Sequence, residues 1–260
     1  MPQTMDNHLK RLKLSAVVPL ILIFIMLMVE LLRQTLPLDL TMLGVHPRHA
    51  DGVVGILTHV FVHSSWRHLL VNSLPLFFLA WCLNYFYKDW SFVIFGVVWV
   101  MTGALTFAIG RDGWHVGASG IIYALFAFLF FSGLVNKTKP MVAASLLIVF
   151  LYGGMVWGIT PYFVERNVSW EGHLAGFLSG MVAVLFFHSK SDYAKEPERH
   201  YDDAEDEALY NKWVESLKPM PKVTGDDVKS DTAEPSGEQP DGEQRQDGGD
   251  ATAARSSDGH

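Results

Sequence analysis

Long apolar runs separated by short polar segments fill the first 190 residues of the chain. A helix that crosses the hydrocarbon core of a membrane needs about 20 mainly apolar residues. Six runs approach that length: Leu14–Leu32, Leu69–Tyr87, Ser91–Ile109, Ser119–Val135, Met141–Ile159 and His173–Phe187. Inside lipid a chain must satisfy its own backbone hydrogen bonds, so helices are the expected form. The pattern therefore predicts an all-α, polytopic membrane protein built as a bundle of six transmembrane helices.

The end of the chain differs from this body in composition. Residues 196–260 carry 18 acidic and 7 basic side chains, whereas the residues before them carry 9 and 13. Such a polar segment cannot bury enough apolar surface to offset the entropy lost on ordering, so we expect a mostly disordered tail. Within it, Leu209, Trp213 and Leu217 recur every four residues, which is typical of an amphipathic helix.

These patterns divide the chain into three parts. We expect an N-terminal segment at 1–13, a membrane domain at 14–189 and an acidic tail at 190–260, with a short helix at 201–217. The sequence indicates no partner for the tail. Because the net charge is −7 and the acidic residues concentrate in the tail, we expect no nucleic-acid binding.

The charges that flank the apolar runs predict the orientation. Lys10, Arg11 and Lys13 precede the first run, and basic residues are enriched on the cytoplasmic side of membrane proteins. With six crossings, both termini then lie in the cytoplasm. We expect an integral, multi-pass protein of a bacterial-type inner (plasma) membrane. The first run is too long for a cleaved signal peptide and has no small-residue cleavage site after it.

Polar residues occur at matching ends of three predicted helices. His68 and Asn72 lie at the start of the second, Ser119 starts the fourth, and His173 starts the sixth. These three helices run in the same direction, so all four residues fall on the same side of the membrane. Ionisable residues in membrane segments are rare and commonly functional. The sequence therefore places a polar site at the outer end of the bundle.

Ser119 lies between small residues, in Gly117-Ala118-Ser119-Gly120. Its helix N-terminus offers free N–H donors, which suit a developing oxyanion. A serine there is also an ordinary helix cap, and the glycines are also typical of helix packing. We take Ser119 as a candidate nucleophile because a base is available on another helix.

That base is His173, since an imidazole can accept a serine proton and return it to a leaving amine. Gly176 and Gly180 follow it at small-residue spacing, which favours close approach of this helix to the serine helix. We place no carboxylate against His173, and we expect Glu171 to face the aqueous loop. A Ser-His dyad is therefore favoured over a triad. Tyr123, one turn after Ser119, is a candidate to pack on the His173 ring.

His68 and Asn72 are four residues apart and share a helix face, and both side chains can donate hydrogen bonds. Together with the Ser119 backbone N–H they form a candidate oxyanion pocket. Upstream, the His59-x-x-x-His63 spacing suits zinc, but the glutamate of the His-Glu-x-x-His motif is absent. We therefore expect no metal site and no cofactor.

Taken together, these motifs resemble those of the rhomboid intramembrane serine proteases, over roughly Leu14–His188. The resemblance rests on Gly117-x-Ser119-Gly120 with Tyr123, on His173-x-x-Gly176-x-x-x-Gly180, and on His59, His63 and His68-x-x-x-Asn72. It implies a six-helix bundle with Ser119 as nucleophile and His173 as base. Asn72, His68 and the Ser119 N–H would surround the oxyanion.

The resemblance further implies an intramembrane serine endopeptidase whose partners are the lipid bilayer and single-span transmembrane substrates. The chain departs from the family in one place, because the Trp-Arg pair common in the first outer loop is missing between Gln34 and Thr58. Two other functions stay open at this point. One is an inactive rhomboid-like protein that binds membrane helices, and the other is a transporter that uses its intramembrane histidines.

Overall fold

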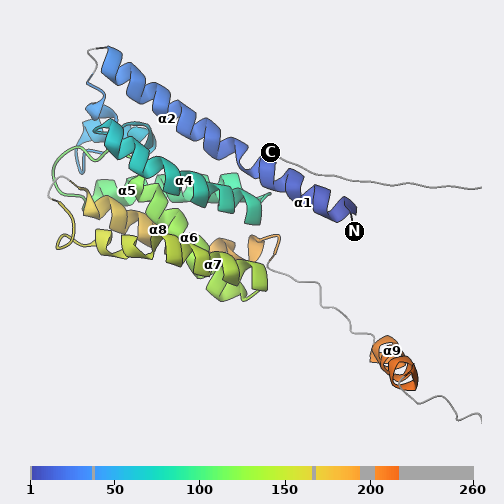
Figure 1. Cartoon of the computed structure of the whole chain (residues 1–260). Coiled ribbons are helices and arrows are strands. Elements are labelled where there is room, and N and C mark those ends of the chain that lie inside the picture. Colours follow the sequence, from blue (N-terminus) through green and yellow to red (C-terminus); the bar gives the residue numbers. More distant parts are fainter. Residues whose placement is uncertain (1, 37–38, 166–167, 194–202, 217–260) are drawn as a thin grey trace, which may run out of the picture. The chain divides into compact units, whose positions relative to one another are not determined.

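The structure, a computed structural model, describes residues 2–36, 39–165, 168–193 and 203–216. Its described part is helical, with one isolated antiparallel bridge between Val45 and His115. The long helices are α1 (Pro2–Ser15), α2 (Val17–Thr35), α4 (Trp66–Phe86), α5 (Ser91–Ile109), α6 (Ser119–Asn136), α7 (Lys139–Tyr152) and α8 (Trp170–Phe187). Figure 1 shows α2 and α4–α8 running alongside one another as a bundle.

Six segments of the described chain are long and apolar enough to cross a membrane. They are Asn7–Thr35, Trp66–Phe86, Ser91–Ile109, Ser119–Asn136, Lys139–Ile159 and Trp170–Lys190. Each coincides with one of the six runs predicted from the sequence, so the all-α, six-helix architecture is confirmed. The helix bounds differ by a few residues, because the segments Trp66–His68 and Trp170–Gly172 form the first turns of their helices.

The α6 helix forms the centre of the bundle, where it packs against α4, α5, α7 and α8 (Figure 1). Of its span, 67% is buried inside the protein, against 11% for the span that contains α7. The side chains that surround α6 include Leu76, Leu79 and Ile94, all fully buried. Outward-facing positions on the peripheral helices are also apolar, as at Phe92 and Phe150, which suits contact with lipid rather than water.

The fifth span is only partly an α-helix. α7 ends at Tyr152 and continues as a 3₁₀ helix, η4 (Gly153–Ile159). Gly153 and Gly154 interrupt the run of good helix formers at this point, and glycine weakens a helix interior. This change of winding leaves two carbonyl groups of η4 to accept hydrogen bonds from side chains of α6 and α8.

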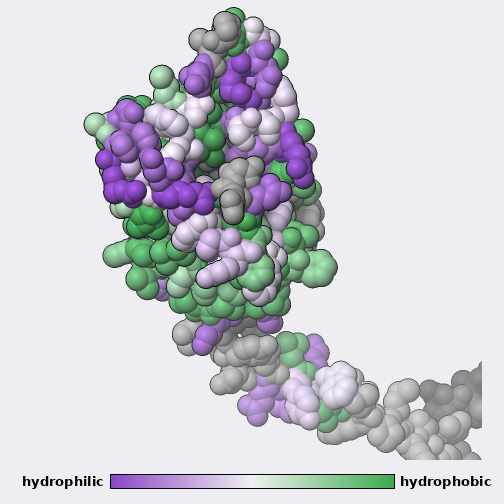
Figure 2. All heavy atoms as spheres, turned by 90° about the vertical axis from the view of Figure 1, so that its left-hand side faces the viewer, coloured by the Kyte–Doolittle hydropathy of each residue, from purple (hydrophilic) through white to green (hydrophobic). Residues whose placement is uncertain are grey.

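A compact loop region joins α2 to α4 and closes one end of the bundle. It contains η1 (Thr41–Leu43), η2 (Ala50–Gly52), α3 (Gly55–Thr58) and η3 (His59–Phe61). The bridge between Val45 and His115 ties this region to the loop between α5 and α6. Figure 2 faces this end and shows hydrophilic side chains gathered over its upper part, above a hydrophobic lower part.

The polypeptide after residue 200 forms a second unit. In it the structure describes α9 (Asp203–Ser216), at the position where the sequence predicts a short helix. Side chains of Leu209 and Trp213 are exposed on this helix. The tail predicted to be disordered lies, beyond α9, outside the described residues. The described part of the first unit ends with η5 (His188–Lys190) and the residues up to 193.

Candidate active site

Ser119 is the first residue of α6, and the N-cap residue of this helix is Ala118. α8 begins at Trp170, where the Ser169 side chain accepts a hydrogen bond from the Gly172 N–H at 3.1 Å. His173 therefore lies one turn inside α8 rather than at its first residue. Ser119 Oγ and His173 Nε2 are 3.0 Å apart. Two residues from distant parts of the sequence thus come within hydrogen-bonding distance.

The second ring nitrogen of His173 fixes how the proton is shared. Nδ1 lies 2.9 Å from the carbonyl oxygen of Gly158. A carbonyl oxygen can only accept a hydrogen bond, so Nδ1 carries the proton of the neutral ring. Nε2 then presents its lone pair to the Ser119 hydroxyl, which is the arrangement that a general base requires. No carboxylate of the described residues contacts His173 in this geometry.

Tyr123 contacts His173 through its ring and η4 through its hydroxyl. Its ring stacks on the His173 ring with centroids 4.3 Å apart and planes 14° apart. Its hydroxyl donates to the Met155 carbonyl at 2.8 Å. Met155 and Gly158 both belong to η4, so the 3₁₀ segment positions both the tyrosine and the imidazole. The packing on His173 that the sequence suggested for Tyr123 is present.

Asn72 and His68 lie on α4 beside Gly117. The backbone of Gly117 has φ +110°, a conformation that glycine adopts readily. A Cβ atom at this position would lie 2.8 Å from His68 Cε1 and 3.6 Å from Asn72 Nδ2. Glycine is therefore required here both by conformation and by space, and its absence of a side chain lets α4 reach the serine loop.

Both α4 side chains retain hydrogen-bonding capacity at this point. Asn72 is buried, and its Nδ2 has no hydrogen-bond partner among the described atoms. An unpaired buried donor costs free energy, so its retention is typical of a site that receives a ligand. His68 Nδ1 lies 3.1 Å from the Ser64 hydroxyl, which orients the ring with Nε2 toward Gly117.

A cavity of about 720 Å³ opens beside Ser119 and His173 at the loop end of the bundle. His68 lines it as well, together with Phe163 and Glu165 of the loop before α8. Both polar and apolar side chains line it. The cavity is thus large enough for a peptide segment and gives the Ser119 hydroxyl a route to water.

Close approach of α6 and α8 sets the Ser119–His173 distance. A Cβ atom on Gly176 would lie 1.9 Å from the Gly120 carbonyl oxygen, and one on Gly180 would lie 2.1 Å from that of Ala124. No larger residue fits at either position without separating the helices. The small-residue spacing in the sequence therefore corresponds to direct backbone contact.

His59 and His63 lie close to the site, but each bonds to a different backbone group. His59 Nδ1 lies 2.8 Å from the Gly55 carbonyl oxygen, and His63 Nε2 accepts from the Ala118 N–H at 3.3 Å. Burial lowers the pKa of His59 to about 4 and that of His63 to about 3. Both side chains are therefore neutral, and the loop before Ser119 is held by the His63 ring and by the His59 backbone carbonyl, which accepts from the Gly117 N–H at 2.9 Å.

One prediction about Glu171 was wrong, and one residue was missed. Glu171 does not face an aqueous loop, because it is buried and its Oε1 lies 3.7 Å from Arg111 Nε. His115 was not singled out, yet its Nδ1 lies 2.5 Å from the Ser169 hydroxyl that caps α8. These contacts fasten the loop before α6 to the start of α8. Nothing in the local sequence marks them, because the partners are more than 50 residues apart.

Residues 50–190 match the family model described as the rhomboid domain. An uncharacterized protein of Mycobacterium tuberculosis is 28% identical over 201 residues, which cover 75% of this chain and 84% of the relative. The putative rhomboid protease YdcA of Bacillus subtilis is 26% identical over 49% of this chain and 63% of its own length. Rhomboid protease GlpG of Salmonella choleraesuis is 24% identical over 48% of this chain and 45% of its own length.

Proposed function

We propose that this chain, which belongs to the rhomboid family, is an intramembrane serine endopeptidase. Ser119 is its nucleophile and His173 is its general base. The 3.0 Å distance between Ser119 Oγ and His173 Nε2 carries the proposal, together with the Gly158 carbonyl that fixes the His173 tautomer. The substrates are single-span transmembrane proteins. The proposal accounts for a polar, water-accessible cavity within a bundle whose outer surface is apolar.

The reaction begins when Ser119 Oγ attacks the carbonyl carbon of the scissile peptide bond. As the C–O bond forms, the hydroxyl proton passes to His173 Nε2 and the carbonyl oxygen becomes an oxyanion. His173 then gives this proton to the leaving amine as the C–N bond breaks, which leaves an acyl ester on Ser119. Water hydrolyses the ester by the same steps, and His173 again transfers the proton.

The oxyanion is stabilised by donors that are already in position. Asn72 Nδ2 is buried without a partner, and His68 lies beside it against Gly117. The N–H of Ser119 belongs to the first turn of α6, where backbone donors have no intrahelical acceptor. Because these groups need no reorganisation when the charge develops, they favour the transition state over the ground state.

Orientation follows from the basic residues before the first span. We infer that Lys10, Arg11 and Lys13 stay in the cytoplasm, so both ends of the membrane domain are cytoplasmic and the cavity faces the opposite side. The membrane is a bacterial-type inner membrane. Substrates are then cut near the outer surface of that membrane.

A fluorophosphonate probe tests the proposal, because it reacts covalently with an activated serine. The wild-type chain in detergent should be labelled on the peptide that contains Ser119, as mapped by mass spectrometry. Ser119→Ala and His173→Ala should not be labelled. Ser132→Ala is the matched control, since this buried serine belongs to the same helix outside the cavity. Equal labelling of all four proteins would reject Ser119 as the nucleophile.

A folding control separates loss of chemistry from loss of structure. Ser119→Ala removes one hydroxyl from a hydrogen bond, so its thermal midpoint should stay close to that of the wild type. If the wild-type chain is folded by this measure and still takes up no probe, the proposed activity is contradicted.

A further inference from the structure

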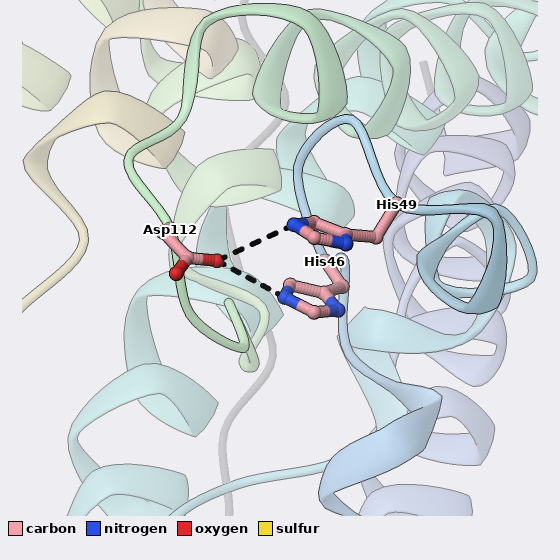
Figure 3. Close-up of side chains that lie close together, drawn as sticks. All are labelled: His46, His49 and Asp112. Carbon is pink, nitrogen blue, oxygen red and sulfur yellow. Dashed lines mark hydrogen bonds and ion pairs between the residues drawn. The ribbon is translucent and has the colours of Figure 1, made fainter.

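Three side chains from two loops converge at the end of the bundle, outside the Ser119 cavity (Figure 3). His46 and His49 belong to the loop region between α2 and α4, and Asp112 belongs to the loop between α5 and α6. The bridge between Val45 and His115 holds the two loops together through hydrogen bonds of 2.9 and 2.8 Å. The three side chains are thus presented on a paired backbone.

The ligand-type atoms of these residues point at one another. Asp112 Oδ1 lies 3.1 Å from His46 Nε2 and 3.6 Å from His49 Nε2, as the dashed lines in Figure 3 show. One atom from each residue lies within 4.8 Å of the other two. In a tetrahedral zinc site, ligands about 2.0–2.1 Å from the metal lie about 3.3 Å from one another. Both distances to Asp112 Oδ1 lie within about 0.3 Å of this spacing.

His46 also has the outer support that is typical of a metal ligand. Its Nδ1 lies 2.9 Å from Asp51 Oδ1. Metal-bound histidines commonly donate their second N–H to a carboxylate, which fixes the tautomer and raises the basicity of the ligating nitrogen. The ring also packs against Trp114, with 4.6 Å between the ring centroids.

When no cation is present, a proton satisfies the contact between His46 and Asp112. Protonated on both ring nitrogens, His46 donates from Nδ1 to Asp51 and from Nε2 to Asp112, at 2.9 and 3.1 Å. A divalent cation at Nε2 would take the place of that proton beside the same Asp112 oxygen. The Nε2 atom of His49 faces the same carboxylate oxygen and is a third potential metal ligand.

We propose that His46, His49 and Asp112 bind one divalent cation of the zinc class, with Asp51 as a positioning residue for His46. Two imidazoles and one carboxylate favour Zn²⁺ and its neighbours over Mg²⁺ or Ca²⁺, which take oxygen ligands. Water completes the coordination, because His49 and Asp112 are exposed.

Binding requires one rotation. The His46 and His49 rings are parallel within 7°, so their nitrogens do not yet converge on a single point. His49 has 56% of its side chain exposed and is free to turn, whereas His46 is held by Asp51 and Trp114. The bound cation then clamps the loop before α3 to the loop that leads into Ser119.

Isothermal titration of the untagged, chelator-treated full chain with ZnCl₂ tests the site. We expect one zinc per chain, and Co²⁺ should give the visible absorption of a low-symmetry nitrogen–oxygen site. His49→Gln and Asp112→Asn should each weaken binding at least about tenfold, and Asp51→Asn should weaken it about 10–100-fold. Asp39→Asn, an exposed carboxylate of the same loop that lies outside the cluster, is the matched control and should bind as the wild type does.

Three results would overturn the proposal: no zinc binding by the folded wild type, unchanged affinity in His49→Gln and Asp112→Asn together, or an equal loss in Asp39→Asn. Because the His49 side chain is exposed, its replacement should leave the chelator-treated protein with a wild-type thermal midpoint. Metal binding is measured without proteolysis, so this result is separate from the role of Ser119.

Discussion

Two groups of histidines lie at the same end of the bundle and differ in what faces their ring nitrogens. In the cavity, His173 and His63 contact a backbone carbonyl, a serine hydroxyl and a backbone N–H. In the outer loops, both ring nitrogens of His46 face carboxylates, those of Asp51 and Asp112. The same side chain is therefore set up for different chemistry by its neighbours.

The pKa values in the loops follow this difference. Burial lowers the pKa of His63 to about 3, because the water that its charged form would lose outweighs the attraction of the Glu30 carboxylate. Partial burial also lowers the pKa of His46, but hydrogen bonds with Asp51 and Asp112 outweigh it and raise the pKa above its ordinary value. An imidazole among neutral groups stays available as a base, whereas one among carboxylates attracts a proton or a metal cation.

The largest effect that tests this contrast concerns His173. Replacing it with glutamine removes the proton acceptor of Ser119, so peptide hydrolysis should fall by about 10³-fold or more. His188→Gln is the control, since this histidine ends the same segment and bonds to the Val184 carbonyl away from the cavity. Initial rates of substrate cleavage measure both, and comparable rates for the two variants would remove His173 from the reaction.

The next effect concerns the unpaired amide of Asn72. Asn72→Ala should lower kcat by about 10²–10³-fold, because one oxyanion donor is lost. Ser73→Ala changes the neighbouring residue, whose hydroxyl bonds to the Leu69 carbonyl within its own helix, and should keep the wild-type rate. Wild-type turnover by Asn72→Ala would show that this donor does not contact the oxyanion.

A smaller effect tests the helix contact that holds the dyad. Gly176→Ala places a methyl group against the Gly120 carbonyl, so the free energy of unfolding should fall by about 1–3 kcal/mol. Gly96→Ala, where an added Cβ meets nothing within 4 Å, should be neutral or stabilising. Thermal unfolding in detergent compares them, and equal midpoints would contradict the close approach of α6 and α8.

The smallest effect is a pH dependence of stability. His59 and His63 are buried and neutral, with folded-state pKa values below the unfolded value of 6.5. The unfolded chain therefore binds more protons as the pH falls below 6.5, and stability is lost in that direction. As the pH falls from about 7.5 to 5.5, each of these two histidines should lower the free energy of unfolding by about 1 kcal/mol. His63→Gln should flatten the pH profile of the thermal midpoint, and an unchanged profile would argue against this source.

The sequence predicts the six helices because their signal is local. Apolar runs of about 20 residues define membrane helices without reference to neighbouring segments. It also predicts that Ser119, His173, His68 and Asn72 share one end of the bundle, because helix direction alternates with each crossing. The Gly176 and Gly180 spacing further indicates which helix approaches Ser119.

Contacts that depend on the irregular segments could not be predicted from apolar runs and residue spacing. The carbonyl of Gly158 that orients His173 depends on the change from α7 to η4, which apolar composition does not reveal. The proximity of Asp112 to His46 depends on the bridge at Val45, which joins residues 70 positions apart. The sequence-based expectation of no metal site was argued from His59 and His63 alone. It did not consider His46 and His49, which lie earlier in the same loop region.

Cleavage of a single-span transmembrane protein in reconstituted liposomes tests the central claim most directly. The wild-type chain should convert the substrate into two fragments whose new termini map near one membrane surface, while Ser119→Ala should leave it intact at equal protein levels. Continued cleavage at the same bond by Ser119→Ala, or an intact substrate with folded wild-type protein that fluorophosphonate does not label, would contradict the account.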